Sequence, residues 1–248
     1  MALDYRTALI TGASSGLGRA LATWFAKQGV KVYAAARRTQ DLEALQREVG
    51  ENVVPLTLDV SKAAATFTRI AQLDEECGGL DLVVANAGVG GETRPARIDW
   101  AQLQNLIDVN VAGATATLVA ALPRMVERKR GHLVGISSIA ALGALPRNAG
   151  YCASKAWVSM FCESLRFDTE RHGVHVTAIL PGFVKSEMTA TNKHPMPFIL
   201  ETADAADRMG RAIARRAKTY AFPWPLAAVA SVGQALPRPL YRLVGKRL

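Results

Sequence analysis

The sequence contains few cysteines. Cys77, Cys152 and Cys162 are the three that occur in 248 residues, and an odd number cannot pair completely within one chain. The last two lie ten residues apart on what we expect to be one helix. About 15 Å of helical rise then separates them, which exceeds the reach of a disulfide. This scarcity excludes a small disulfide-stabilised scaffold and predicts a reducing, cytoplasmic setting.

The chain also lacks an export-signal pattern. Asp4 and Arg6 interrupt the first apolar residues, so no basic stretch precedes an apolar run of signal-peptide length. Aromatic residues make up 6% and charged residues 21% of the chain, whereas hydrophobic residues make up 50%. This composition excludes intrinsic disorder and supplies one large core. We therefore expect residues 1–248 to form a single domain.

Acidic residues are missing from the end of the chain. Residues 208–248 hold 9 Lys and Arg and no Asp or Glu, whereas residues 1–207 hold 21 of each charge type. The whole excess of +9 therefore lies in the last part of the chain. Because it follows no zinc-finger spacing and no basic heptad pattern, we predict no nucleic-acid partner.

Short apolar runs rich in β-branched residues alternate with longer stretches in which apolar residues recur at helical spacing. The runs predict strands that are buried on both faces, and the stretches predict crossover helices between them. The sequence thus predicts an α/β fold, a doubly wound, mostly parallel seven-stranded sheet with helices on both faces. The expected strands are residues 7–10, 31–36, 53–58, 80–85, 133–136, 174–180 and 219–222.

One stretch near the end of this pattern has no helical periodicity. Residues 186–203 carry Pro195 and Pro197 between His194 and Phe198. Stretches of this kind are usually functional loops. We expect a loop or a mobile lid over a site.

The first expected strand leads directly into a glycine-rich turn. Glycines there allow a tight turn and a close approach of the backbone to a pyrophosphate, and the following helix offers free N–H donors. This strand–turn–helix context predicts a dinucleotide-binding site, the alternative being an ordinary glycine-rich connection. The turn comprises Thr11, Gly12, Ala13, Ser14, Ser15, Gly16, Leu17 and Gly18.

Two arginines end the second expected strand, where a protein that binds NAD places an acid on the ribose. Arg37 and Arg38 follow Ala36 directly. Planar guanidinium groups pair bidentately with phosphate oxygens. We therefore predict NADP as the cofactor and consider NAD less suited. In the alternative interpretation the arginines merely solvate the strand end and Asp41 turns toward the ribose.

Tyr151 and Lys155 lie four residues apart on an expected helix over 151–172, so they project from one face with about 6 Å of rise between them. A lysine cation near a phenol lowers the phenol pKa from its usual value of about 10. This pair predicts an acid–base role for Tyr151. Ser137 and Ser138 follow the fifth expected strand at its carboxyl end, where open α/β sheets bind ligands.

Together these motifs resemble those of the classical short-chain dehydrogenase/reductase family, whose members are single-domain Rossmann-fold oxidoreductases. The matches run in order from Thr11 to Ser186. The resemblance implies that hydride passes between NADP(H) and a carbonyl or alcohol substrate while Tyr151 gives or takes the proton. It implies further that Lys155 supports Tyr151 and binds the nicotinamide ribose, Ser138 orients the substrate, and Asn110 holds a water for proton relay.

The resemblance also implies the residues that hold the cofactor. The chain departs from the family pattern at Ala85, where asparagine is usual, and at Ser186, where threonine is usual. Asp59 and Val60 match a pair expected to contact adenine. The implied cofactor-binding residues are Thr11, Gly12, Ser14, Ser15, Gly16, Leu17, Gly18, Arg37, Arg38, Asp59, Val60, Asn86, Ala87, Gly88, Tyr151, Lys155, Pro181, Gly182, Val184 and Ser186.

No metal is expected, because His132, His172, His175 and His194 show no metal-ligand spacing.

The last segment, 221–248, departs from the common family ending. Its first part, 221–236, is uncharged, and Pro223 and Pro225 argue against a membrane-spanning helix. The three- or four-residue spacing of several apolar residues predicts one helical face docked on the protein, the alternative being peripheral contact with anionic lipid. These residues are Leu226, Val229, Val232, Leu236 and Leu240.

Two classes of function remain. A non-catalytic NADP-binding sensor or scaffold needs the glycine-rich turn but could dispense with the set Asn110, Ser138, Tyr151 and Lys155. All four are present, which favours an enzyme acting on a small-molecule carbonyl or alcohol.

The resemblance also implies a homo-oligomer. We expect a dimer formed through long helices within 100–129 and 151–172. Trp157, Phe161 and Leu165 supply candidate apolar surface.

Overall fold

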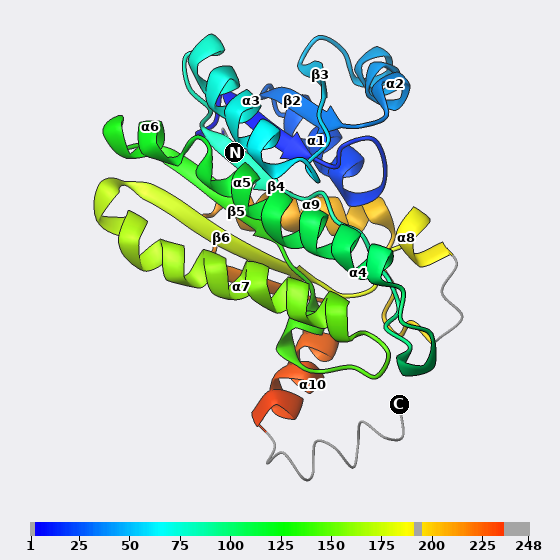
Figure 1. Ribbon diagram of the computed structural model, residues 1–248. Helices are drawn as coiled ribbons and strands as arrows, with labels where there is room; N and C mark the ends of the chain where they lie inside the picture. Colours follow the sequence, from blue (N-terminus) through cyan, green and yellow to red (C-terminus); the bar gives the residue numbers. More distant parts are fainter. Residues whose placement is uncertain (1–2, 191–194, 236–248) are drawn as a thin grey trace.

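Seven runs of small and β-branched residues form one parallel sheet in the order β3-β2-β1-β4-β5-β6-β7 (Figure 1). The computed structural model describes residues 3–190 and 195–235. All seven predicted strands are confirmed, with their ends shifted by at most two residues. They are β1 (Thr7–Thr11), β2 (Lys31–Ala36), β3 (Val53–Thr57), β4 (Leu82–Ala85), β5 (Gly131–Ile136), β6 (Val174–Pro181) and β7 (Thr219–Phe222).

Alternate residues of the central strands enter two separate cores. Ala8 and Ile10 of β1 pack in one hydrophobic cluster, and Leu9 packs in the other. Likewise Val84 of β4 belongs to the first cluster and Val83 to the second. Because successive side chains of a strand point to opposite faces, both faces of the sheet are buried. Each face therefore requires its own layer of helices.

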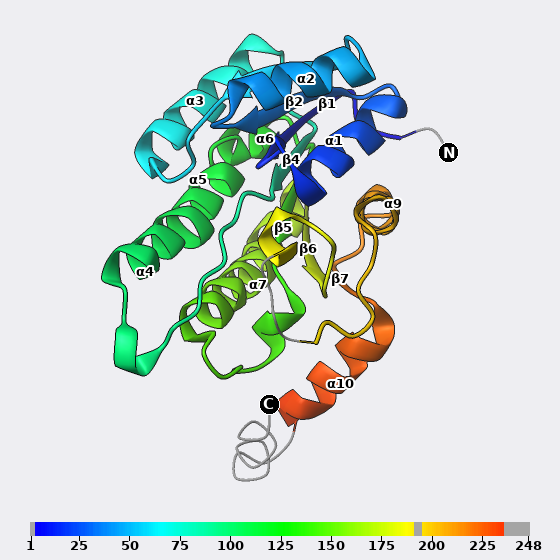
Figure 2. The same ribbon diagram turned by 90° about the vertical axis from the view of Figure 1, so that its right-hand side faces the viewer.

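Helices cover both faces, so the predicted doubly wound α/β fold is confirmed (Figure 2). The strand order reverses between β1 and β4, and the carboxyl ends of strands at such a reversal are where open sheets bind ligands. The first core is covered by α1 (Gly16–Lys27), α2 (Thr39–Val49) and α9 (Thr202–Ala214), and the second by α3 (Ala63–Glu76), α5 (Ala114–Val119) and α7 (Ala149–Thr169).

The long helix expected within 100–129 is wrong in one respect, because the stretch is divided. It consists of α4 (Trp100–Ile107), the π-helical segment η2 (Asp108–Gly113), α5 and α6 (Leu122–Glu127). A Cβ on Gly113 would lie 2.4 Å from the Val60 carbonyl oxygen, so η2 passes in backbone contact with the segment that follows β3. Pro123 at the start of α6 explains the second break, since proline has no N–H to donate to the Val119 carbonyl four residues earlier and its ring clashes with that carbonyl.

The same stretch, Trp100–Glu127, is long and apolar enough to span a membrane by length and composition alone. Within the protein 56% of its most apolar window is buried, and Leu118 and Met125 pack in the second core. A core helix passes the same test. The stretch is therefore explained by its packing on the sheet.

The segment 186–203 contains more regular structure than we expected. Residues Glu187–Ala190 form the short helix α8, Val184 pairs with Leu200 in an isolated parallel bridge, and α9 begins at Thr202. Residues 191–194 lie outside the described part of the chain. The absence of a helical period predicted a loop because a single turn of helix is too short to show one.

The docking face predicted for the last segment is also partly wrong. Helix α10 (Trp224–Ala235) packs through Leu226, and Ala227 and Ala230 join that contact. Val229 and Val232 are 69% and 63% exposed. At about 100° per residue, steps of three drift steadily around a helix, so 226, 229 and 232 do not share one face.

The two remaining members of that predicted set, Leu236 and Leu240, lie outside the described residues. Trp224, at the start of α10, is 78% exposed, and α10 extends away from the body of the protein (Figure 1). Contact of this exposed face with lipid stays the alternative.

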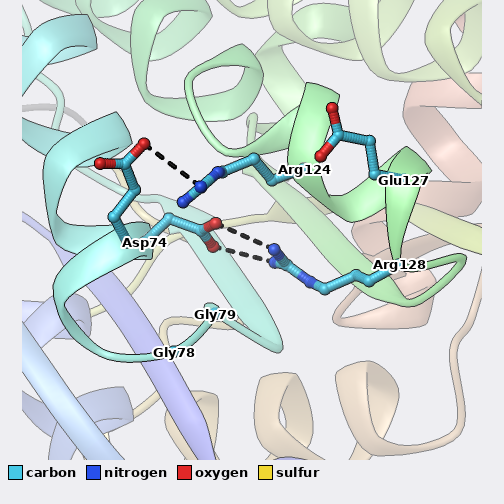
Figure 3. Close-up of a pocket in the computed structure, with 7 residues that line it drawn as sticks. Asp74, Gly78, Gly79, Arg124, Glu127 and Arg128 are labelled. Atoms are coloured by element: carbon cyan, nitrogen blue, oxygen red, sulfur yellow. Dashed lines mark hydrogen bonds and ion pairs between the residues drawn. The ribbon is translucent and has the colours of Figure 1, made fainter.

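A surface hollow of about 350 Å³ lies at the opposite, amino-terminal end of the sheet, between α3 and α6 (Figure 3). Asp74 is buried there, and Arg128 donates to both of its carboxylate oxygens at 2.9 Å. Arg128 also donates to the Leu80 carbonyl at 2.8 Å, and Arg124 pairs with Glu75 at 3.3 Å. The two arginines neutralise the two acidic side chains. The lining of the hollow therefore consists of ion pairs that join α3 to the end of α6.

Candidate active site

The segments that carry the predicted site residues all reach the carboxyl edge of the sheet. This placement follows from the parallel topology, in which every strand of the sheet ends at the same edge. The segments are residues 11–18 after β1, 37–38 after β2, 59–60 after β3, 86–88 after β4, Asn110 in η2, Ser138 after β5, Tyr151 and Lys155 in α7, and 181–186 at the end of β6.

The β1–α1 turn brings backbone into direct contact with backbone. Gly12 and Gly16 have positive φ angles of +69° and +54°, which favour glycine. A Cβ on Gly18 would lie 2.3 Å from the Gly12 oxygen and 2.4 Å from Nδ2 of Asn86, so no larger residue fits. Ser15 is the N-cap residue of α1, but its side chain does not cap the helix. The first N–H groups of α1 therefore remain available to an anion.

Thr11 and Asn86 join the ends of β1 and β4. The Thr11 hydroxyl accepts from the backbone N–H of Asn86 at 3.1 Å and of Ala87 at 3.2 Å. The Asn86 amide donates to the Thr11 carbonyl at 2.8 Å. Ala85, where the family has asparagine, is buried. The hydrogen bonds of Thr11 and Asn86 thus hold the glycine-rich turn against β4 without a polar side chain at position 85.

Gly88 follows Asn86 by two residues and lies against two of the predicted catalytic residues. A Cβ at Gly88 would lie 3.2 Å from Nζ of Lys155 and 3.4 Å from Oδ1 of Asn110. A side chain there would therefore press on both groups. The strand end after β4 lies between the glycine-rich turn on one side and α7 on the other.

Arg38 lies beside the glycine-rich turn, as predicted for a phosphate-binding residue. Its guanidinium donates to Oγ of Ser14 at 3.2 Å and pairs with Asp41 at 2.9 Å and with Glu187 at 3.2 Å. Arg37 is exposed to solvent. Asp41 thus contacts Arg38, and the choice between the arginines and Asp41 at the ribose stays a prediction.

The carboxylate of Asp59 is engaged locally. It accepts from the backbone N–H of Ser61 at 3.1 Å and from its hydroxyl at 2.8 Å. The neighbouring Val60 presents its carbonyl to Gly113. Contact of Asp59 and Val60 with adenine stays a prediction.

The end of β6 lies over the glycine-rich turn. The backbone N–H of Gly182 donates to the Phe222 carbonyl at 2.7 Å and Ser186 lies against Gly16, whose Cβ would be 3.5 Å from that of Ser186. Val184 is buried. Residues 181–186 thus lie beside the glycine-rich turn and the start of α1.

Ser138 and Tyr151 meet at the end of β5. Burial raises the pKa of Tyr151 above its usual value, and the nearby Ser138 side chain opposes this effect only in part. The predicted lowering of this pKa by Lys155 is therefore wrong for the protein alone, because desolvation of the phenol outweighs it. At neutral pH Tyr151 carries its proton.

Lys155 is buried, and its ammonium lies 5.9 Å from the centre of the Tyr151 ring. It donates to the Ile136 carbonyl at 3.0 Å. Burial lowers the pKa of Lys155 to about 8. Helix α7 therefore places a lysine with a pKa of about 8 at the end of β5.

Asn110 owes its position to the π-helical segment. Its Oδ1 accepts from the Val89 N–H at 2.8 Å, and its Nδ2 donates to the Val89 carbonyl at 2.9 Å and to Oγ of Ser154 at 3.1 Å. Ser154 in turn donates to the Tyr151 carbonyl at 2.8 Å. Asn110 thus ties η2 to both β4 and α7, and its role in proton relay stays a prediction.

The two serines after β5 point in different directions, as expected. Ser137 is buried and donates to the Lys155 carbonyl at 2.7 Å, while Ser159 donates to Ser137 at 2.7 Å. The Ser138 hydroxyl donates to the Pro181 carbonyl at 3.5 Å and accepts from the Ala140 N–H at 3.1 Å. Ser137 therefore fixes α7 on the sheet, and the substrate-orienting role of Ser138 stays a prediction.

Ser154 and Glu187 contact predicted site residues but were not predicted from the sequence. A buried polar residue between Tyr151 and Lys155 on one helix could have indicated Ser154, whereas nothing in the pattern marks Glu187. Over residues 3–190 and 195–235, no group of three or more His, Cys, Asp or Glu side chains is placed to hold a metal ion.

Known proteins resemble this chain over most of its length. A family model described as short chain dehydrogenase matches residues 6–196. An uncharacterized oxidoreductase of Myxococcus xanthus is 56% identical over 249 residues, which cover 99% of this chain and 98% of that protein. An NADP-dependent 3-hydroxy acid dehydrogenase of Salmonella typhi is 41% identical over 182 residues, or 71% of each chain.

Among solved structures, the closed form of serine dehydrogenase complexed with NADP+ superimposes with a TM-score of 0.78. It is 31% identical, and the match covers 87% of this chain and 94% of that one. The likeness therefore extends from sequence to the arrangement of the whole sheet.

We predict that replacing the buried Lys155 by methionine raises thermal stability at neutral pH. Burial lowers the lysine pKa from 10.5 to about 8, which corresponds to roughly 3 kcal/mol of destabilisation, offset in part by the hydrogen bond to Ile136. Below pH 8 the lysine is charged in both the folded and the unfolded chain and the destabilisation is complete. It disappears as the pH rises toward 10.5.

Thermal unfolding of wild type and Lys155→Met at pH 7 and pH 10 measures this effect. We expect a higher Tm for the variant at pH 7 and a smaller difference at pH 10. Lys27→Met, at the exposed end of α1, is the control and leaves Tm nearly unchanged. A Tm difference for Lys155→Met that does not vary with pH would contradict the assignment of a buried cation.

Proposed function

The chain belongs to the short-chain dehydrogenase family, and on that premise we propose that it is an NADP(H)-dependent oxidoreductase that interconverts a carbonyl compound and an alcohol. One observation carries the proposal. Lys155 lies 5.9 Å from the centre of the Tyr151 ring, and Ser138 lies close enough to Tyr151 to act on its pKa, at the same sheet edge as the glycine-rich turn.

The β1–α1 turn fits a dinucleotide. Gly12 and Gly18 leave no room for side chains, and the N-terminus of α1 carries no side-chain cap. The N–H groups of that turn would hold the pyrophosphate, Ser14 and Arg38 the 2′-phosphate, and Lys155 the nicotinamide ribose. The bound cofactor supplies or accepts the hydride.

The proton chemistry follows from the pKa directions of the site. Because burial raises the pKa of Tyr151, the phenol is protonated and suited to donate to a carbonyl oxygen. Ser138 would donate a second hydrogen bond to the same oxygen and stabilise developing negative charge there. Lys155, with its pKa at about 8, would stabilise the phenolate that remains. In alcohol oxidation each transfer runs in reverse.

The relatives support the choice of NADP. The Salmonella protein is NADP-dependent by its name, and the serine dehydrogenase structure contains NADP+. Arg38, placed on Ser14 beside the turn at 3.2 Å, supports the same choice in this chain.

Tyr151→Phe is expected to lower kcat by at least about 10²-fold while NADPH binding changes little. The phenol would act in proton transfer, whereas the phosphates of the cofactor would bind at the glycine-rich turn. Stopped-flow or steady-state NADPH oxidation and a fluorescence titration measure the two quantities. Retention of near wild-type kcat would remove Tyr151 from the mechanism.

We expect the dissociation constant of NADPH to be lower than that of NADH. Replacing both Arg37 and Arg38 by alanine should weaken NADPH binding by about tenfold or more, because charged hydrogen bonds to phosphate are lost. Arg47→Ala, which removes an exposed arginine of α2, is the control. Equal affinities for both cofactors in the wild type would refute the NADP assignment.

We further propose a homodimer through the outer face of α4, α5 and α7. Trp157 is 49% and Met160 is 64% exposed on α7, and Trp100 is 67% exposed on α4. Exposed apolar groups of this size on adjacent helices are typical of an interface.

Light scattering at micromolar concentration should give the mass of a dimer for the wild type. Met160→Asp should shift the mass toward the monomer, whereas Val229→Asp, at an equally exposed position on α10, should not. A monomer mass for the wild type would contradict the proposal.

A further inference from the structure

The carboxylate of Glu187, the first residue of α8, lies where Arg38 and the glycine-rich turn converge. Its Oε2 accepts from Oγ of Ser15 at 3.0 Å and from Nη2 of Arg38 at 3.2 Å. Its Oε1 lies 3.4 Å from Nη1 of the same arginine. Nη2 also donates to Oγ of Ser14 at 3.2 Å. The carboxylate thus receives both arms of the guanidinium fork and a hydroxyl of the turn.

These donors are the ones that a phosphate group would use. A guanidinium fork binds the oxygens of carboxylates and phosphates in the same bidentate geometry. Ser15 and Arg38 come from the ends of β1 and β2, the two strands that flank the adenosine side of a dinucleotide site. Glu187, in contrast, comes from α8, far along the chain and next to the end of β6.

The contact is more specific than an ordinary surface ion pair. Ser186, which precedes Glu187, lies against Gly16 of the turn, and the backbone N–H groups of Thr189 and Ala190 return to the Ser186 carbonyl at 3.1 and 3.0 Å. The short helix is thereby placed over the turn. Arg38 lowers the pKa of Glu187, so the carboxylate is charged at neutral pH.

We propose that Glu187 is a specificity-determining residue that competes, as a tethered anion, with the 2′-phosphate of the cofactor for Arg38. The inference rests on the proposed NADP dependence. A phosphate with a charge of about −2 and a carboxylate repel each other and cannot share one guanidinium fork. Binding of a 2′-phosphate therefore displaces α8 from the turn, and binding of an unphosphorylated dinucleotide does not.

The coupling is reciprocal, since two ligands that exclude one another each weaken the other by the same factor. Glu187 raises the dissociation constant of every ligand with a 2′-phosphate and leaves that of NADH nearly unchanged. Position 187 therefore sets how strongly the protein distinguishes the two cofactors. It also makes the position of α8 depend on which cofactor is bound.

The test uses full-length Glu187→Gln, which keeps the size of the side chain and its capacity to accept from Ser15 but removes the charge. Calorimetric titration with NADPH, NADH and adenosine 2′,5′-bisphosphate gives the three dissociation constants. We expect binding of NADPH and of the bisphosphate to tighten by about threefold to tenfold, the range for an exposed ion pair plus relief of repulsion. NADH binding should change by less than about twofold by the same reasoning.

Glu201→Gln is the matched control. Glu201 pairs with Lys185 on the same segment, and its side chain is 61% exposed compared with 67% for Glu187, but it does not contact Arg38. This variant should leave all three constants unchanged. A second measurement, hydrogen exchange at residues 187–190, should show faster exchange when the bisphosphate binds the wild type and no change when NADH binds.

The outcomes separate this inference from the function on which it rests. If the wild type prefers NADPH but Glu187→Gln binds every ligand as the wild type does and α8 exchange does not respond, the competition is refuted and the NADP assignment stands. If the wild type binds NADPH and NADH equally, the NADP assignment fails and the inference fails with it. Equal tightening by Glu201→Gln would also refute the competition, because general charge would then explain the effect.

Discussion

The backbone contact between the β1–α1 turn and the end of β4 determines where the rest of the site lies. A Cβ on Gly18 would lie 2.3 Å from the Gly12 oxygen, so α1 can begin at this point only if both positions are glycine. The same contact holds Asn86, whose amide donates to Thr11 at 2.8 Å. Two residues later, Gly88 lies against Lys155 and Asn110. Close contacts therefore run without a gap from the glycine-rich turn through the end of β4 to the predicted catalytic residues.

Because a Cβ at position 88 would lie 3.2 Å from Nζ of Lys155, glycine at this position leaves room for the buried lysine. Lys155 is enclosed by Gly88, the Ile136 carbonyl and the Tyr151 ring, and its pKa falls to about 8 as a result. Burial of a lysine without a carboxylate partner costs folding free energy. The same burial places the Lys155 ammonium 5.9 Å from the centre of the Tyr151 ring. Under the proposed role of Lys155 in catalysis, stability and function are opposed at this one residue.

The regular parts of the fold were predictable from sequence because their causes are local. Short continuous apolar runs, typical of strands buried on both faces, identified β1 to β7, and the glycine spacing after β1 identified the turn. The π-helical segment around Asn110 was not predictable, since it depends on the contact of Gly113 with Val60, two residues that are distant in the chain. The face of α10 was misassigned because three-residue steps drift around a helix, so Val229 turns to solvent while Leu226 packs.

The motif spacing predicted which residues form the candidate site, but it did not predict their electrostatics. Tyr151 and Lys155 were identified from spacing, but the direction of the Tyr151 pKa depends on how deeply α7 buries the phenol, which no spacing reveals. Glu187 could not be predicted as a site residue, because its partners Ser15 and Arg38 are distant in the sequence and only the fold brings them together.

Hydride transfer itself is tested most directly by following NADPH oxidation and alcohol formation together, across carbonyl compounds graded by size and polarity and including 3-oxo acids. The account predicts that at least one class is reduced, with alcohol formed in proportion to NADPH oxidised. Tight binding of NADPH without oxidation by any carbonyl, and without reduction of NADP+ by any of the corresponding alcohols, would contradict it and identify the protein as a non-catalytic NADP-binding sensor or scaffold.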